Sequence, residues 1–258
     1  MSRNLREKLS PWAVALGLLI LWEVAVRVSG VTSEVMPSAS QSFIALWEFR
    51  GPLWSNALYT LMTTSIGFVI AVAVGIALGI ATGVSRPVYI ALYPLLVGFN
   101  SIPKVAVVPI LVIWFGINMW PPILTAFVLA FFPIVVNVAA GLATIEPELR
   151  DVLRALGANE RDILVKVGLP RSLPFLFASL KVAITLSFVG AVIAETVAGS
   201  KGIGHVMLIA SSNFNTPLMF AGLIVIAAMA IGMYAVFAIT DRHFTGWATR
   251  SMDYTGGG

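Results

Sequence analysis

The chain contains no cysteine, and charged residues make up only 11% of its 258 positions. Without cysteine, disulfides, thiolate metal sites and cysteine nucleophiles are excluded. Soluble domains carry about 25% charged residues, so an ordinary soluble protein is excluded too. The two histidines, His205 and His243, stand far apart and outside the apolar segments, and no Ser/His/Asp arrangement or helical His-x-x-x-His pattern accompanies them. We therefore expect neither a metal site nor a catalytic site.

Apolar residues are what the chain has in abundance: 59% of positions, with a mean hydropathy of +0.94. Six segments are about as long as the ~20 residues that a membrane-spanning helix needs, although the first is marginal. They are Trp12–Val28, Ala57–Val84, Pro87–Phe115, Trp120–Ala143, Leu173–Val197 and Pro217–Ile239. We expect an all-α, polytopic membrane bundle of about six spans, with residues 1–258 as a single transmembrane domain.

The first and third of these segments contain sequence features that predict how each one is built. No Ala-x-Ala cleavage pattern follows the first apolar run, so we interpret it as a retained span and not as a signal peptide. In the third span, Pro103 predicts a break near Ile102–Pro103, because proline lacks an N–H donor and clashes with the preceding turn.

The basic residues predict the orientation. If the N-terminus is cytoplasmic, only Arg50 and Lys201 fall on the opposite side of the membrane. The cytoplasmic side then holds Arg3, Arg6, Lys8, Arg86, Arg150, Arg154, Arg161, Lys166, Arg171, Arg242 and Arg250. This distribution follows the positive-inside rule, so both termini are expected in the cytoplasm. The net charge of +4 is not concentrated on one polar domain, and we expect no nucleic-acid partner.

Residues 146–170 form the one long charged and amphipathic segment, and the predicted orientation puts it in the cytoplasm. Pro147 suits the first position of a helix, Gly157 suits a left-handed C-terminal cap, and Asn159 can cap a second helix. We expect Leu169-Pro170 to end that helix and turn the chain back toward the membrane. Apolar residues recur at helical spacing, which a merely solvated loop would not need. The segment is thus predicted to be a two-helix knob that contacts another component.

The second span carries a small residue every four positions, which forms one smooth helix face. The five residues are Gly67, Ala71, Gly75, Gly79 and Gly83. Such a face lets a neighbouring backbone approach closely. Two interpretations stay open: close packing inside the bundle, or a specific subunit interface.

Charged side chains at membrane depth cost several kcal/mol unless they are paired or wetted. Glu23, Lys104, Lys181 and Glu195 are in this position. We interpret Lys181 as an anchor, a subunit contact or a functional group. Lys104 and Glu195 both fall in the outer half of the membrane. They either pair with each other or line a translocation path together with the polar residues at the predicted break, Asn100 and Ser101.

The run Asp151-Val152-Leu153-Arg154-Ala155-Leu156-Gly157, followed by Leu169-Pro170, resembles the signature loop of ABC-importer permeases. The family pattern has Glu-Ala-Ala, then Gly, then Ile-x-Leu-Pro; here Asp, Val and Leu replace the first three and Val167 replaces the isoleucine. Further stretches resemble the nitrate/sulfonate/taurine branch of that family. They are Ser101-Ile102-Pro103, residues 109–116 and Gly202-Ile203-Gly204, and the likeness runs from Pro37 onward.

The resemblance implies the type I ABC-importer permease fold and a bacterial inner-membrane, multi-pass protein. It implies inward movement of a small solute, such as a sulfonate or nitrate anion, by alternating access. The residues it assigns to ATPase coupling are Asp151, Arg154, Ala155, Leu156, Gly157, Ala158, Leu169 and Pro170. The implied partners are an ATP-binding subunit, a second copy of this permease in a homodimer, a periplasmic or extracellular solute-binding protein and membrane lipid.

No cofactor is expected in this chain, since ATP and Mg would be bound by the partner ATPase. In agreement, the sequence has no Gly-x-x-x-x-Gly-Lys-Ser/Thr phosphate loop. A stand-alone secondary transporter or channel is the alternative, but it would need ion-coupling carboxylates in broken helices and repeated halves. An intramembrane enzyme would need a convergent catalytic set, which the sequence does not offer.

Overall fold

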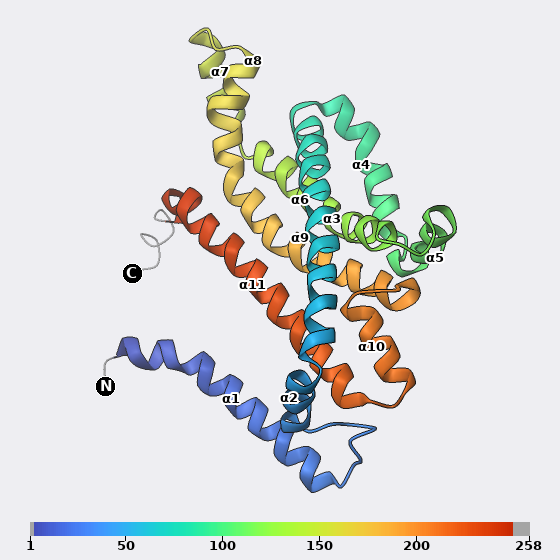
Figure 1. Ribbon diagram of the computed structural model, residues 1–258. Helices are drawn as coiled ribbons and strands as arrows, with labels where there is room; N and C mark the ends of the chain where they lie inside the picture. The colour runs from blue at the N-terminus through green and yellow to red at the C-terminus, as the bar shows by residue number, and fades with distance from the viewer. Residues whose placement is uncertain (1–2, 250–258) are drawn as a thin grey trace.

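The computed structural model describes residues 3–249, with side chains from residue 13 to residue 246, and all its regular structure is helical (Figure 1). The expected all-α bundle is confirmed. The side chains of Arg3, Arg6, Lys8 and Arg250, which were used to predict the orientation, lie outside the described side chains. The helices are α1 (Arg3–Ser29), α2 (Ala39–Glu48), α3 (Arg50–Val84), α4 (Arg86–Ser101), α5 (Lys104–Phe115), α6 (Trp120–Ala143), α7 (Pro147–Ala155), α8 (Glu160–Ile163), the π-helix η1 (Leu164–Gly168), α9 (Leu169–Ala198), α10 (Ile203–Ser212) and α11 (Thr216–Thr249).

Within the described residues, four helices are long and apolar enough to cross a membrane. They cover Arg50–Val84, Trp120–Ala143, Glu160–Ala198 and Thr216–Gly246. Helices α4 and α5 make a fifth span if they are counted together, and they meet at a 90° bend. The bend lies at Ile102 and Pro103, so the predicted break is confirmed. The first expected span lies within α1.

The core forms where α3, α6 and α9 pack along one another (Figure 1). The small-residue face of α3 lies against α6. A Cβ added to Gly67 would meet the carbonyl oxygen of Ile123 at 2.5 Å, and one added to Gly79 would meet the Cβ of Val138 at 2.6 Å. The small residues are therefore needed for close packing inside the chain, as the first of the two interpretations predicted.

Helix α1 stands away from the bundle and is held near its C-terminal end (Figure 1). The indole Nε1 of Trp22 donates to the Pro37 carbonyl at 3.1 Å, and its ring lies 5.5 Å from that of Phe220 on α11. Glu23 accepts from the backbone N–H of Ser40 at 2.9 Å and pairs with Arg27 at 2.7 Å. These contacts give Glu23 a structural role, because it fastens α1 to the start of α2.

Candidate functional site

Helices α7 and α8 project together from one end of the bundle, opposite α2 and α10 (Figure 1). Helix α7 begins at Pro147, as predicted, and stops where Gly157 adopts a left-handed conformation with φ +86°. The Gly157 N–H donates to the Arg154 carbonyl at 2.9 Å, and the Ala158 N–H donates to the Leu153 carbonyl at 3.0 Å. This pair of bonds is the Schellman cap that a C-terminal glycine favours. The turn between the two helices is thus fixed by the local sequence.

The second helix of the knob starts at the predicted cap. Asn159 accepts the Asp162 N–H on its side-chain oxygen at 2.8 Å. Arg154 then ties α7 to α8, since its guanidinium lies 2.7 Å from Glu160 and 3.3 Å from Asp151. The hydrogen bond that Arg154 donates to Glu160 raises the pKa of Arg154 above its ordinary value. Arg154 and Asp151 therefore hold the knob together, in addition to the coupling role expected of them.

The tip of the knob is apolar and exposed. Leu156 is 79% exposed and Val152 is 55% exposed, although the surrounding segment is charged. Beside them is a shallow hollow lined by Leu153, Gly157 and Ala158. Exposed apolar side chains rimmed by charges are typical of a protein-binding surface. This tip contains four of the residues to which the family resemblance assigns coupling: Ala155, Leu156, Gly157 and Ala158.

Leu169 and Pro170 do not end the helix, so that prediction is wrong. The chain continues from α8 through η1 directly into α9. In η1 the Leu169 N–H donates to the Leu164 carbonyl, five residues earlier. This wider π-turn precedes Pro170, which has no N–H to donate and therefore sits in the first turn of α9. Both residues lie at the base of the knob, where it joins the membrane helix.

The polar residues at the α4–α5 bend cluster around the break. The Lys104 ammonium donates to the backbone carbonyl of Asn100 and, at 3.0 Å, to its side-chain oxygen. The Ser101 hydroxyl donates to the Val97 carbonyl at 2.9 Å. The Lys104 ammonium thus bonds a carbonyl in the last turn of α4, where a helix end leaves carbonyls without an intrahelical N–H partner. Asn100 and Ser101 are exposed on the single chain.

Glu195 lies elsewhere and is fully buried, at 0% exposure. Its carboxylate accepts the Thr60 hydroxyl at 2.9 Å and the Gly204 N–H at 3.1 Å, and Thr63 lies 3.5 Å away. Of the two alternatives for these residues, the pairing of Lys104 with Glu195 is therefore wrong. Glu195 takes its partners from α3 and α10, while Lys104 bonds Asn100. The carboxylate fixes the loop 199–202 against the bundle instead of lying beside the bend.

The Gly202-Ile203-Gly204 sequence is explained by this buried carboxylate. A Cβ on Gly202 would lie 2.2 Å from the Glu195 carboxyl carbon, and one on Gly204 would lie 2.5 Å from the Val192 carbonyl oxygen. Gly202 also has φ +100°, which side chains rarely adopt. Only glycine lets the start of α10 close over Glu195.

Sequence reasoning missed the partners of these buried charges. Lys181 on α9 pairs with Asp241 on α11 at 2.8 Å, where an anchor or subunit contact was expected. Thr60 is buried on α3 and was not singled out. The available signals were weak: Thr60 and Thr63 lie one turn apart, and Asp241 is the first acid after the final apolar run, which contains none.

Residues 71–246 match the sequence profile of the family described as "Binding-protein-dependent transport system inner membrane component". The riboflavin transport system permease protein RibX of Chloroflexus aurantiacus is 35% identical over 232 residues, covering 89% of this chain and 87% of that protein. The putative aliphatic sulfonates transport permease protein SsuC of Escherichia coli is 29% identical, covering 86% and 85%. The formylaminopyrimidine transport permease protein ThiX of Halalkalibacterium halodurans is 28% identical, covering 93% and 96%.

Among solved structures, an inward-facing MetNI methionine ABC transporter aligns with a TM-score of 0.68 at 21% identity, covering 76% of this chain and 98% of that one. This likeness supports the type I permease fold. Permeases of this kind are not enzymes, because ATP is bound and hydrolysed by a separate ATPase subunit, and the solute is delivered by a binding protein. The profile match covers more than half of the chain, and we conclude that it belongs to the family of binding-protein-dependent transport system inner membrane components, as a permease subunit of a bacterial ABC importer.

Proposed function

We propose that residues 146–170 form the coupling segment through which the partner ATPase drives this permease, within a single transmembrane domain of residues 1–258. The observation that carries the proposal is the exposed apolar tip at Leu156 and Val152, on a knob braced internally by Arg154. Helix α9 continues from this knob to the buried Glu195. A movement of the knob caused by the ATPase would therefore be transmitted along one continuous helix to the far side of the bundle.

Leu156→Asp tests this docking role. Leu156 is mostly exposed, so the substitution leaves the fold intact but puts a charge in the proposed contact. We expect the purified variant to lose the ATPase subunit during size-exclusion chromatography. Val35→Asp, at a position 72% exposed near the opposite end, is the matched control and keeps the ATPase bound. Full retention of the ATPase by the Leu156 variant would refute the assignment.

We also propose that a second copy of this chain faces the α4–α5 bend. Asn100, Ser101 and Lys104 are open or partly open on the single chain at membrane depth. Polar groups at that depth face protein or a water-filled cavity and not lipid. In a homodimer the two α4–α5 bends would face each other across a water-filled path, so these polar groups would be surrounded by protein and water instead of lipid.

Because the chain has no cysteine, single cysteines can test the dimer directly. Ser101→Cys is expected to form a disulfide-linked dimer in membranes under mild oxidation. Ile231→Cys, on the exposed side of α11, is the control and stays monomeric. The reverse pattern would place the interface on α11.

The solute proposed for this path is a small organic or inorganic anion, such as a sulfonate or nitrate. Lys104 supports an anion because its ammonium lies at the bend, and one relative is named for aliphatic sulfonates. Heterocyclic solutes are the second candidate, favoured by the relatives named for riboflavin and formylaminopyrimidine. Uptake in reconstituted vesicles, with the cognate binding protein and each solute class in turn, distinguishes them.

The proposed orientation has both termini and residues 146–170 in the cytoplasm of a bacterium. It is supported by the placement of basic residues described above. Labelling of Gly157→Cys from the inside and of Lys201→Cys from the outside, with a membrane-impermeant thiol reagent, tests it. Labelling on the same side would contradict the orientation.

A further inference from the structure

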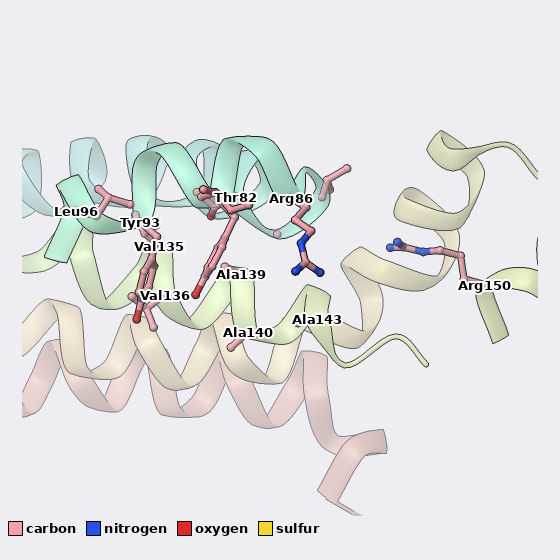
Figure 2. A pocket seen from close by; sticks show the side chains of 14 residues that line it. Thr82, Arg86, Tyr93, Leu96, Val135, Val136, Ala139, Ala140, Ala143 and Arg150 are labelled. Carbon is pink, nitrogen blue, oxygen red and sulfur yellow. The ribbon is translucent and has the colours of Figure 1, made fainter. Parts of the chain in front are cut away.

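A cavity of about 680 Å³ lies at the knob end of the bundle, between the end of α3, the start of α4 and the last turns of α6 (Figure 2). Helix α7 closes it on one side by contributing Arg150. None of the predicted coupling or path residues lines it, so it is a separate feature. Its size is within the usual range of ligand sites.

Two arginines define the mouth of the cavity. Arg86 from α4 and Arg150 from α7 extend toward one another across it (Figure 2). Neither guanidinium has a hydrogen bond or ion pair with another residue in the described part of the chain, and the buried Nε of Arg150 has no partner. Asp151 and Glu160 line adjoining hollows, but both are paired with Arg154. Glu160 interacts electrostatically with Arg150, but its hydrogen bond and its ion pair are with Arg154. Two guanidinium groups that face each other, with no ion pair of their own among the described residues, favour an anion between them.

The walls behind this mouth are apolar. They are formed by Ile90, Leu96, Val135, Val136, Ala139 and Ala140. Tyr89 and Tyr93 stack with ring centroids 4.8 Å apart along the same wall. The Thr82 hydroxyl is already bonded to the Leu78 carbonyl of its own helix at 2.8 Å. The cavity thus combines an anion-binding mouth with a surface suited to hydrocarbon.

We propose that this cavity binds an anionic phospholipid of the cytoplasmic leaflet, with its phosphate between Arg86 and Arg150 and an acyl chain along the α4–α6 wall. A small soluble oxyanion would satisfy the two guanidinium groups but would leave the apolar wall uncovered. Basic pockets between membrane helices on the cytoplasmic side are known to bind acidic headgroups. The assignment depends on the proposed orientation, which puts α7 in the cytoplasm.

The location of the cavity gives the lipid a mechanical consequence. Arg86 starts α4, which leads to the bend at Ile102 and Pro103, and Arg150 lies on the proposed coupling knob. One phosphate held by both residues would connect α7 with α4. Anionic lipid would then stabilise one relative position of the knob and the proposed path.

The test measures lipid retention by the purified permease alone, without ATPase or solute, so it is independent of the transport proposal. The detergent-solubilised protein is titrated with dioleoyl phosphatidylglycerol or dioleoyl phosphatidylcholine, and bound lipid is counted by native mass spectrometry. We expect preferential retention of phosphatidylglycerol. Arg86→Gln with Arg150→Gln removes both charged donors to the phosphate, so this double variant should retain phosphatidylglycerol about tenfold more weakly, or more weakly still. Arg171→Gln with Arg242→Gln removes the same charge outside the cavity and should change nothing.

A second variant tests the hydrocarbon wall without touching the arginines. Ala140 is exposed to the cavity, so Ala140→Phe fills it without disturbing the core. We expect this variant to lose phosphatidylglycerol. Equal retention of the two lipids, or unchanged retention in the double arginine variant, overturns the proposal. Displacement of the lipid by millimolar inorganic phosphate would also overturn it and would assign the site to free oxyanions.

Discussion

The hydroxyl of Thr60 on α3 donates to the carboxylate of Glu195 on α9 at 2.9 Å, across 135 residues of sequence. The same hydroxyl oxygen accepts the N–H of Ile203, also at 2.9 Å. One buried threonine therefore joins α3, α9 and the start of α10. Gly202 completes the connection, because its N–H donates to the Asn56 side chain at 2.8 Å.

Thr60→Val should destabilise the protein, because it leaves the Ile203 N–H unpaired and removes a donor from buried Glu195. The cost of leaving a buried polar group unsatisfied is about 1–3 kcal/mol. The loss of stability is measured as a fall in the melting temperature of the detergent-solubilised protein. Thr185→Val is the control, because the hydroxyl of the exposed Thr185 donates to the Lys181 carbonyl of its own helix. Equal melting temperatures for the two variants would show that the Thr60 connection contributes nothing.

Gly67→Ala should destabilise the packing of α3 against α6. The added Cβ would meet the Ile123 carbonyl oxygen at 2.5 Å, which backbone movement alone can relieve. Overpacking of this kind costs about 1–3 kcal/mol. Gly232→Ala on α11 is the matched control, because nothing lies within 4 Å of its Cβ. Both substitutions gain the same helix propensity, so the difference in melting temperature isolates the close approach. A difference near zero would contradict the packing role.

Asp241→Asn should destabilise the protein by leaving Lys181 without its charge partner. The two side chains are only 23% and 21% exposed, so water replaces the lost partner poorly. We expect a loss of about 1–3 kcal/mol, below the range for a fully buried pair. Exchanging the two residues, with Lys181→Asp and Asp241→Lys in one variant, should recover part of the lost stability. Asp162→Asn removes the exposed partner of Lys166 and should cost less than about 1 kcal/mol. Equal effects of the two Asp→Asn variants would rule out a structural role for Lys181.

Gly157→Asp should leave insertion into the membrane intact, while uptake is uncoupled from ATP hydrolysis. Nothing lies within 4 Å of the added Cβ, so the substitution meets no clash, and its structural cost is confined to the left-handed backbone at φ +86°. The new charge enters the proposed ATPase contact. Gly157→Asn is the control for the backbone, because asparagine tolerates the left-handed conformation and adds no charge. ATPase activity and uptake are measured together in vesicles. Normal uptake by the Asp variant would contradict the coupling role.

Lys104→Met should reduce uptake of an anionic solute and leave the yield of folded protein unchanged. Among the described residues, Lys104 hydrogen-bonds only Asn100, on the other side of the bend, so its replacement breaks no hydrogen bond between distant helices. The initial rate of uptake at several solute concentrations is the measurement. Lys201→Met, at an exposed lysine on the proposed outer side, is the control. Unchanged uptake in the Lys104 variant removes this residue from the path.

Features that depend on neighbouring residues were predictable from the sequence. The helix break at Pro103, the left-handed cap at Gly157 and the Asn159 cap each arise from steric limits or hydrogen bonds within a few residues. The apolar spans and the placement of basic residues were predictable for a similar reason. Each span must be long and apolar enough to cross the membrane, and each loop follows the positive-inside rule, whatever the other segments do. These signals were enough for the fold class and, with the signature loop, for the family.

Tertiary structure alone decided which distant groups meet. Membrane depth allowed Glu195 to pair with Lys104, but the close approach of α3 and α10 surrounds Glu195 with Thr60 and Gly204. Asp241 was chosen as the partner of Lys181, and Arg86 was brought opposite Arg150, by helix packing that no local pattern specifies. Membrane depth gives a residue's position along one axis only. The rotation of each helix about its own axis, and the helices it contacts within the membrane plane, depend on how whole helix faces fit together. The small residues of α3 against α6 are an example.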